Sequence, residues 1–246
     1  MIEQRRPFGG DPVDHALTAL VGPIDGARVV DVGGGSGTRA VPLAIHGCRV
    51  TVVDSSVDAL AILHRRAQDA GVVDRVTGVQ ADADQLGTVI AADDADLVLC
   101  HHLLEEVDDP ATVIAALAVA VRPGGFVSVL VAGRLGAVVG QTLVGRFANA
   151  RAMLSDPDGR FAASDPLRRR FDADGIADLL NATGLTVESV TGVGVLSGLV
   201  SGAAMQALSG ADGELARLEA DAAVHPALLG IAADLHVVAR RPDTGS

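Results

Sequence analysis

The stretch VVDVGGGSGTRA, residues 29–40, decides how this chain folds, because four of the five residues 33–37 are glycines. Glycine is costly inside regular structure, since it loses more chain entropy on folding than any other residue. Such a cluster is useful where the chain turns sharply or where a ligand approaches the backbone closely. The apolar residues 27–32 predict a buried strand, and residues 38–46 predict a helix that ends at Gly47. A strand, a glycine loop and a helix N-terminus in this order predict a site for a nucleotide-like ligand.

Apolar, strand-like runs alternate with helical patterns along the chain, which is typical of an α/β fold. The predicted strands are residues 27–32, 49–53, 76–80, 97–100, 125–131, 186–191 and 235–239. The predicted helices are residues 38–46, 57–70, 111–121 and 173–182, and the RPGG of residues 122–125 predicts a helix stop and a tight turn. We expect a Rossmann-like, seven-stranded, mostly parallel sheet with helices on both faces, in one domain over residues 1–246.

The alternation breaks after the fifth predicted strand, at residues 133–171. This segment is too long for a simple connection, and residues 137–154 have a helical pattern of their own. Its seven arginines and three aspartates give a local charge of +4 in a chain whose net charge is −12. We interpret it as a helical insertion that caps the carboxyl ends of the strands, where open α/β sheets bind their ligands.

The composition bears on the partners and the compartment. A net charge of −12 and an isoelectric point near 4.8 disfavour broad binding to nucleic acid. Cys48 and Cys100 lie in or beside apolar runs and imply no disulfide framework, which fits a reducing cytoplasm. The N-terminal MIEQRRPFGGD lacks the apolar core of a signal peptide, and the uncharged residues 189–211 are too rich in serine and glycine for a membrane span. We therefore expect a cytoplasmic protein with no membrane partner.

Two classes of ligand compete for the glycine loop. Dinucleotide-binding enzymes use Gly-x-Gly-x-x-Gly, which here would need a glycine at position 38, where a threonine stands. The spacing present, Asp31-x-Gly33-x-Gly35-x-Gly37, resembles motif I of the class I S-adenosylmethionine-dependent methyltransferases. In that resemblance Gly33 and Gly34 let the backbone approach the amino-acid end of the cofactor. Asp31 addresses the cofactor's ammonium directly or through water.

Acidic residues also follow the next two predicted strands. Asp54, with Ser55 after it, ends the second strand, and its carboxylate can accept hydrogen bonds from both hydroxyls of a ribose. Asp82, Ala83 and Asp84 follow the third strand, where the methyltransferases read adenine through a carboxylate and a backbone N–H. A carboxylate for the ribose also occurs in NAD enzymes, so no single strand end is decisive. The three together predict S-adenosylmethionine as the cofactor.

The fourth predicted strand runs into two histidines and two glutamates, in DLVLCHHLLEEVDDP. His101, His102, Glu105 and Glu106 are residue types that bind metals, but no further ligand or supporting group accompanies them, so we expect no metal. In the methyltransferases this strand end lines the pocket near the sulfonium, and we interpret His101 as a residue of that pocket. We interpret Glu105 and Glu106 as capping or solvated residues of the next turn, and His236 as a structural residue.

A closer resemblance extends over most of the chain. The stretches DLVLCHHLLEEVDDP, VRPGGFVSVL, TGLTVESVTGVGVL and LGIAADLHVVARR follow the order and spacing of the bacterial tRNA 5-carboxymethoxyuridine methyltransferases. Those enzymes methylate a carboxylate on a wobble uridine. The resemblance places these residues on the family's cofactor positions: Gly33, Gly34, Asp54, Ala83, Asp84 and His101.

The substrate half of the chain departs from that family. Ala132 and Gly133 stand where the family carries an aromatic residue and an asparagine, and Gly194 stands where it carries an arginine for an anionic substrate. The arginine near the N-terminus that supports the cofactor's carboxylate is replaced around Asp14. Because the fork of an arginine matches a carboxylate, these losses favour another acceptor.

These observations predict an enzyme that moves a methyl group from S-adenosylmethionine to an oxygen or nitrogen of a small molecule. The arginines of residues 133–171 leave room for an anionic acceptor, and tRNA is disfavoured by the net charge. His101 or His102 is a candidate base, although alignment of the reactants alone can suffice. One alternative is a methyltransferase-fold protein that binds the cofactor without turnover. A nicotinamide oxidoreductase is disfavoured by Thr38.

Overall fold

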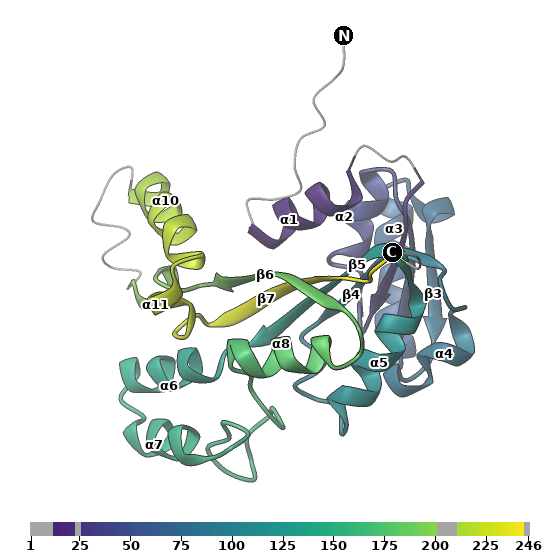
Figure 1. Ribbon diagram of the computed structural model, residues 1–246. Helices are drawn as coiled ribbons and strands as arrows, with labels where there is room; N and C mark the ends of the chain where they lie inside the picture. Colours follow the sequence, from purple (N-terminus) through teal and green to yellow (C-terminus); the bar gives the residue numbers. More distant parts are fainter. Residues whose placement is uncertain (1–11, 23–25, 201–210, 244–246) are drawn as a thin grey trace.

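Seven strands form one sheet in the order β3-β2-β1-β4-β5-β7-β6, in which β7 is antiparallel to both of its neighbours and the other pairs are parallel (Figure 1). The computed structural model describes residues 12–22, 26–200 and 211–243. The strands are β1 Arg28–Val32, β2 Arg49–Asp54, β3 Val76–Gln80, β4 Ala95–His101, β5 Val121–Ala132, β6 Thr186–Val193 and β7 Asp234–Arg240. The predicted seven-stranded, mostly parallel sheet is confirmed.

Helices connect the strands and cover both faces of the sheet. They are α1 Pro12–Val21, α2 Ala40–Ile45, α3 Val57–Asp69, α4 Leu86–Val89, α5 Pro110–Ala120, α6 Arg134–Leu143, α7 Phe147–Ser155, α8 Ala173–Asn181, α10 Ala211–Ala223 and α11 Pro226–Leu229. Short 3₁₀ turns are η1 Val73–Arg75, η2 Ala83–Gln85 and η3 Ser197–Leu199. Apolar residues of α1, α2 and α3 pack on one face, and those of α4, α5 and α8 pack on the other.

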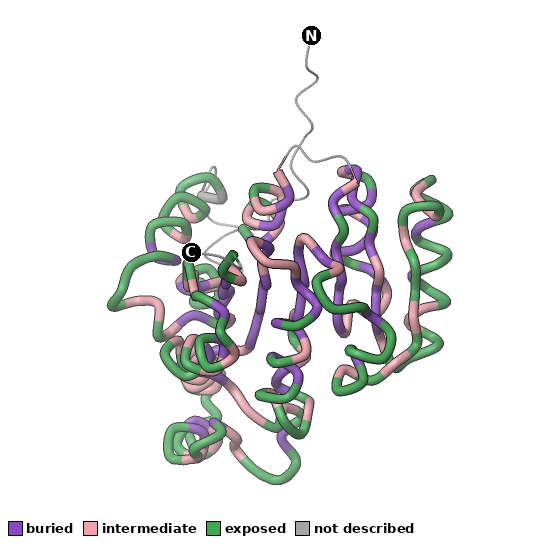
Figure 2. The backbone as a smooth tube through the Cα atoms, turned by 45° about the vertical axis from the view of Figure 1, so that its right-hand side comes forward, coloured by how far each residue is buried: buried purple, intermediate pink, exposed green. Residues whose placement is uncertain are grey.

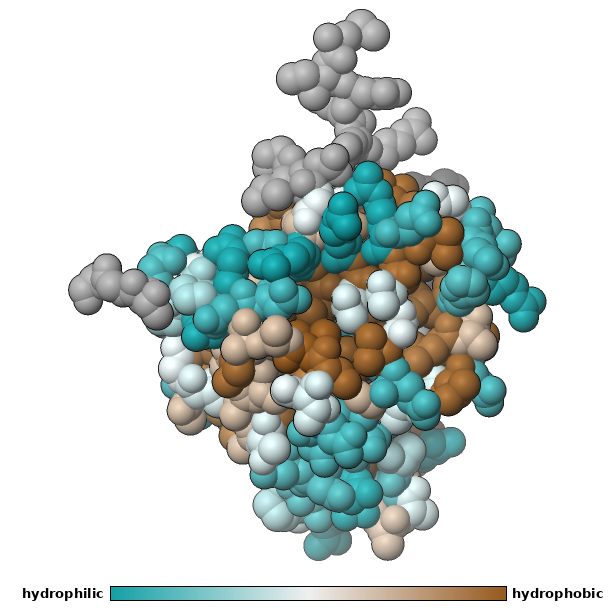
Figure 3. All heavy atoms as spheres, turned by 90° about the vertical axis from the view of Figure 1, so that its right-hand side faces the viewer, coloured by the Kyte–Doolittle hydropathy of each residue, from teal (hydrophilic) through white to brown (hydrophobic). Residues whose placement is uncertain are grey.

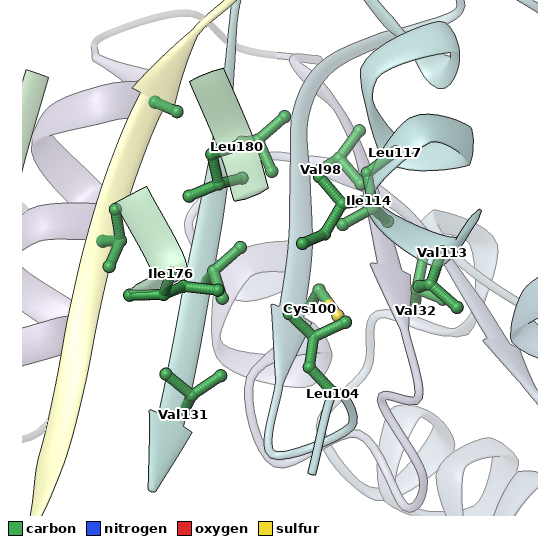
Figure 4. Close-up of a cluster of buried hydrophobic side chains, with 14 of the residues drawn as sticks. Val32, Val98, Cys100, Leu104, Val113, Ile114, Leu117, Val131, Ile176 and Leu180 are labelled. Atoms are coloured by element: carbon green, nitrogen blue, oxygen red, sulfur yellow. The ribbon is translucent and has the colours of Figure 1, made fainter. Parts of the chain in front are cut away.

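The core follows from the composition of the strands. Central parallel strands are covered on both faces, so they read as nearly continuous apolar runs, as β1 and β4 do here. Figure 2 shows the strands buried and the outer faces of the helices exposed. Figure 4 shows the cluster on the α5–α8 face, where Ile114 and Leu117 of α5 lie beside Val98 of β4, and Ile176 and Leu180 of α8 lie further along.

The edge strand β3 is less protected than the centre. Its residues are intermediate or exposed along its whole length. Figure 3, which faces this side of the molecule, shows hydrophobic side chains across the middle of the surface and hydrophilic ones above and below. Exposed apolar residues of the helices on either side of β3 in the sequence are Val57 and Ile62 in α3 and Val89 in α4.

The insertion after β5 folds as two helices rather than one. The predicted helical pattern at residues 137–154 is divided into α6 and α7 by Gly145, whose φ of +75° is left-handed. Gly133 and Phe171 form a β-bridge, so both ends of the insertion meet at the end of β5. In Figure 1 the two helices lie at the lower left, at the opposite end of the molecule from β3.

The start of β5 corrects a predicted turn. Helix α5 ends at Ala120 and β5 begins at Val121, which pairs with Ala95 of β4. The next pair is Leu97 with Phe126, so residues 122–125 form an irregularity within the strand instead of a tight turn before it. Pro123 has no N–H for the ladder and Gly124 has a φ of +73°, which accounts for the interruption.

Some expectations fall partly outside the described residues. Within the described ranges, no helix is long and apolar enough to cross a membrane. The uncharged stretch 189–211 begins in β6, and its residues 201–210 are not described. The N-terminal residues 1–11 also lie outside the described part of the chain. Both cysteines are buried, and neither forms a disulfide with a described residue.

The packing of α5 gives a first prediction. Leu117 is fully buried in the α5–α8 cluster, so Leu117→Ala should lower the free energy of unfolding by about 3 kcal/mol, because it removes apolar contacts and leaves a cavity. Val119 in the same helix is 53% exposed, and Val119→Ala should change stability by less than about 0.5 kcal/mol. Urea denaturation of both variants measures the difference. Equal losses would show that α5 does not pack as described.

Candidate cofactor-binding site

The glycine loop after β1 is fastened to the end of β2 by its own backbone. The Gly33 N–H donates to the carbonyl of Val53 at 2.7 Å, and the Gly35 N–H donates to Asp54 Oδ2 at 2.9 Å. Gly33 has a φ of +72°, a conformation that favours glycine. The loop therefore runs across the carboxyl ends of β1 and β2, at the point where strand order reverses between β1 and β4.

A buried carboxyl group lies directly beneath this loop. Asp31 is 1% exposed, and its Oδ2 accepts no hydrogen bond from any described residue. A Cβ on residue 34 would lie 2.4 Å from this Oδ2, so only glycine fits above it. Burial raises the pKa of Asp31 to about 7, with a smaller opposing effect from Arg39 and a further upward effect from Asp54. An uncompensated buried acceptor of this kind suits a cationic ligand group.

A pocket of about 500 Å³ opens beside the loop, on the face of α4 and α5. Six of the predicted site residues line it: Gly33, Asp54, Ser55, Asp82, Ala83 and Asp84. The Asp54 carboxylate is held in place at the pocket wall, because its Oδ1 accepts from the Ser56 N–H at 2.9 Å while Oδ2 holds the loop. Leu103, Val107 and Val113 form the apolar part of the pocket wall, which suits the flat faces of a nucleobase.

Every charged residue that lines this pocket is acidic. The carboxylates are those of Asp54, Asp82, Asp84, Glu106, Asp108 and Asp109. Such a wall repels the pyrophosphate of a dinucleotide and attracts a cation. A neutral adenosine joined to a positive centre fits this electrostatic environment.

The other predicted residues lie outside the pocket wall. Gly35 is in the loop, and Gly34 covers Asp31. Gly37 packs against α3, where a Cβ would come within 2.2 Å of Leu63 Cδ1. His101 is at the end of β4, on the face of the sheet that carries α1 and α2.

His101 belongs to a buried chain of hydrogen bonds that crosses three strands. Its Nε2 is 3.0 Å from Ser128 Oγ in β5, which is 2.8 Å from Nε2 of His236 in β7. Its Nδ1 is buried with no hydrogen-bond partner among the described residues, and burial, with a smaller effect of His236, holds the pKa of His101 well below its usual range. The expected burial of His236 is confirmed, and its bond to Ser128 is a partner that the sequence did not predict.

An ion pair that the sequence did not predict lies near the face of the sheet that carries α1 and α2. Asp14 of α1 pairs with Arg39, the residue before α2. The charge of Arg39 affects the pKa values of both Asp31 and His101, which places its guanidinium near these strand ends. Arg39 therefore brings a guanidinium to these strand ends from the end of the glycine loop.

Glu105 corrects another expectation. It does not cap or solvate the turn after β4, because it is 1% exposed and its Oε1 accepts from the Ala132 N–H at 2.7 Å. The same oxygen is 3.3 Å from Nδ1 of His102. Glu105 therefore joins the end of β4 to the end of β5, whereas Glu106 is exposed and lines the acidic pocket.

The arginines at the end of the insertion hold it against the loop after β4. Arg169 donates to backbone carbonyls of residues 104, 107 and 108, and Arg168 pairs with Asp108. Arg170 forms a buried, two-pronged contact with Asp165 at 2.9 and 3.1 Å. Arg168 and Arg169 thus join the insertion to the loop after β4, and Arg170 stabilises the insertion itself.

Comparison with known proteins identifies the family. The family described as a methyltransferase domain matches residues 1–190. A ubiquinone biosynthesis O-methyltransferase of Xylella fastidiosa is 33% identical over 177 residues, which cover 70% of this chain and 65% of the relative. The enzyme of that name from Paracidovorax citrulli is 38% identical over 108 residues, 43% of each chain. Both matches cover less than two thirds of the relative's own length.

Solved structures agree on the fold. The crystal structure of an S-adenosylmethionine dependent methyltransferase from Mesorhizobium loti has a TM-score of 0.62 at 21% identity, covering 94% of this chain and 99% of the other. The chain belongs to the methyltransferase-domain family, and the cofactor of this class I methyltransferase fold is S-adenosylmethionine. The uncompensated Asp31, the fixed Asp54 and the acidic pocket fit that cofactor's ammonium, ribose and positive sulfonium.

Asp54 provides a test of the ribose position. Asp54→Ala should weaken S-adenosylmethionine binding by about tenfold or more, because charge-assisted hydrogen bonds to the ribose are lost. Calorimetry measures the affinity, and circular dichroism checks that the fold is intact. The exposed Asp74 is the matched control, and Asp74→Ala should leave affinity within about twofold. Unchanged affinity in folded Asp54→Ala would place the ribose elsewhere.

Asp31 provides a pH-dependent test. Its pKa is raised from 3.8 to about 7, so the stability it contributes is present below pH 3.8 and is lost as pH rises through the folded value. The wild type should lose roughly 2–3 kcal/mol of unfolding free energy between about pH 5 and pH 8 that Asp31→Asn does not lose. Urea denaturation at both pH values measures this difference. Parallel pH profiles would show that the carboxyl is solvated in the folded chain.

Proposed function

We propose that this protein is an enzyme that methylates an oxygen or nitrogen atom of a small-molecule acceptor, with a hydroxyl oxygen favoured. The observation that carries the proposal is that every charged residue lining the pocket beside the glycine loop is acidic, which suits a cationic methyl donor. The relatives in Xylella and Paracidovorax are named as O-methyltransferases of ubiquinone biosynthesis, which favours oxygen.

The chain's own residues bind and orient the reactants. When bound, S-adenosylmethionine supplies an electrophilic methyl group on a sulfonium, so the protein's main task is alignment and exclusion of water. We assign Asp31 to the ammonium of the cofactor and Asp54 to its ribose hydroxyls. We assign residues 82–84 to its adenine. His101 is fixed between strands by Ser128 and lies outside the 500 Å³ pocket, and we place it beside the methionine half of the cofactor.

The geometry of two glycines disfavours the wobble uridine of a tRNA as acceptor. A Cβ on residue 133 would lie 2.3 Å from the carbonyl oxygen of Ala232, so an asparagine there would displace the start of β7. Gly194 has a φ of +66°, which would strain an arginine. Neither residue of the tRNA enzymes' substrate grip fits this backbone. Arg168, Arg169 and Arg170 are engaged within the protein and do not substitute for it.

The second candidate is a protein with the methyltransferase fold that binds the cofactor without turnover. It is kept because the chain lacks the residues with which the tRNA enzymes hold their substrate. The two are separated by incubating the protein with labelled S-adenosylmethionine and a cell extract divided into small molecules and RNA. Label in the small-molecule fraction supports the proposed enzyme. Binding of cofactor with no label in either fraction would support the second candidate.

Transfer to tRNA that carries 5-carboxymethoxyuridine should be at least about a hundredfold slower than by an enzyme of that family, since a bidentate arginine contact is lost. The measurement is incorporation of labelled methyl into the modified tRNA. Comparable turnover that is lost in Arg168→Ala or Arg146→Ala would refute the prediction and show a rebuilt anion site.

A further inference from the structure

The two neighbouring histidines after β4 have opposite environments. His101 is tied to Ser128 inside the sheet, its second nitrogen is buried, and its pKa is held low by burial. The side chain of His102 is 52% exposed. Of the two candidate bases in the sequence, His102 is the more exposed, whereas both ring nitrogens of His101 are buried or hydrogen-bonded within the sheet.

His102 is held in an unusual backbone conformation. Its φ is +53°, in the left-handed region that non-glycine residues rarely adopt. The conformation persists because the His102 N–H donates to the carbonyl of Leu130 in β5 at 2.8 Å. Strained residues of this kind cluster at functional sites, where the surrounding structure maintains them. In this conformation the side chain of His102 is 52% exposed, and the next residue, Leu103, lines the acidic pocket.

A buried carboxylate stands behind the imidazole. Glu105 Oε1 is 3.3 Å from His102 Nδ1 and also accepts from the Ala132 N–H, while Oε2 is buried and accepts from no residue in the described part of the chain. The insertion fixes this segment from the other side, because the Arg168 N–H donates to the Glu105 carbonyl at 3.0 Å. A fixed carboxylate at Nδ1 keeps the proton on that nitrogen and leaves Nε2 as the acceptor.

The charges around His102 come from three further elements. The hydrogen bond to Glu105 raises the pKa of His102, and the charge of Asp234 in β7 acts in the same direction. Partial burial and the charge of Arg39, before α2, act against this rise. The imidazole is therefore made more basic by its acidic neighbours than an isolated histidine.

We propose that His102 is the general base of this methyltransferase, that Glu105 is its positioning residue, and that the acceptor group is a hydroxyl. The inference rests on the proposed function. As the acceptor oxygen attacks the methyl carbon, its proton moves to His102 Nε2, and the carbon–sulfur bond breaks with its electron pair remaining on sulfur. The imidazolium then releases the proton to water. A carboxylate is already ionised at neutral pH and needs no base, so the dyad indicates a phenol-like or enol-like hydroxyl.

The first experiment needs no acceptor. The chain has seven histidines, and the C2–H resonance of His102 is assigned by its loss in His102→Asn, a substitution that tolerates a positive φ. The pKa of His102, measured by NMR with S-adenosylhomocysteine bound, should exceed the usual 6.5 and fall in Glu105→Gln, which keeps an acceptor for the Ala132 N–H. A pKa that does not respond to Glu105→Gln overturns the dyad.

The second experiment measures methyl transfer to catechol and phenol, with benzoate and aniline as acceptors that lack a hydroxyl. His102→Asn should lower transfer to catechol by about a hundredfold or more while S-adenosylmethionine affinity stays within about twofold. The wild-type rate should rise with pH through the pKa of His102, and Glu105→Gln should move that rise to lower pH. His64→Asn, in the exposed part of α3, is the control and should leave the rate unchanged.

The outcomes separate this inference from the proposed function. Failure to bind S-adenosylmethionine overturns both. Transfer to benzoate or aniline but to neither hydroxyl compound leaves small-molecule methylation standing and overturns the hydroxyl acceptor and its base. Cofactor binding without transfer to any of the four compounds overturns the hydroxyl proposal as well. Wild-type catechol methylation that His102→Asn leaves within about threefold overturns the role of His102.

Discussion

The structure depends on the carboxyl of Asp31, which is buried beneath the glycine loop and whose Oδ2 no described residue satisfies. Its position forbids a side chain at residue 34, and the loop above it is held by hydrogen bonds from Gly33 and Gly35 to the end of β2. Burying an acid without a partner opposes folding, so the surrounding apolar core must stabilise the fold against it. A ligand cation relieves this cost, which links cofactor affinity to the instability of the free site.

The site divides into two halves on opposite faces of the sheet edge. The acidic pocket, with Asp54 and residues 82–84, faces α4 and α5. Asp31, His101 and the Asp14–Arg39 pair lie toward α1 and α2. The glycine loop and Leu103 lie between them, and a Cβ on residue 33 would meet Leu103 at 3.1 Å. An extended ligand that occupies both halves must cross the edge of the sheet at this contact.

The pattern of apolar residues along the sequence predicted the sheet well, because buried parallel strands are short apolar runs that are bounded by glycine, proline or charged residues. The residues that line the acidic pocket could be located in the same way, since most of them follow strand ends directly. The roles of Glu105 and Arg39 could not be predicted from the sequence. Their partners, Ala132 and Asp14, are 27 and 25 residues away, and only the tertiary fold brings them together. The contrast between His101 and His102 was also hidden, since it depends on one backbone angle and on Ser128 in another strand.

The β-bridge between Gly133 and Phe171 has a consequence for how such an enzyme changes its chemistry. Because the two ends of this segment meet, its length and sequence can vary at a small cost in loop entropy while the sheet keeps its register. The segment is bounded by a backbone pair at its two ends, and two arginines, Arg168 and Arg169, hold it against the loop after β4. Residues between the anchors can then be replaced without disturbing the glycine loop or the acidic pocket.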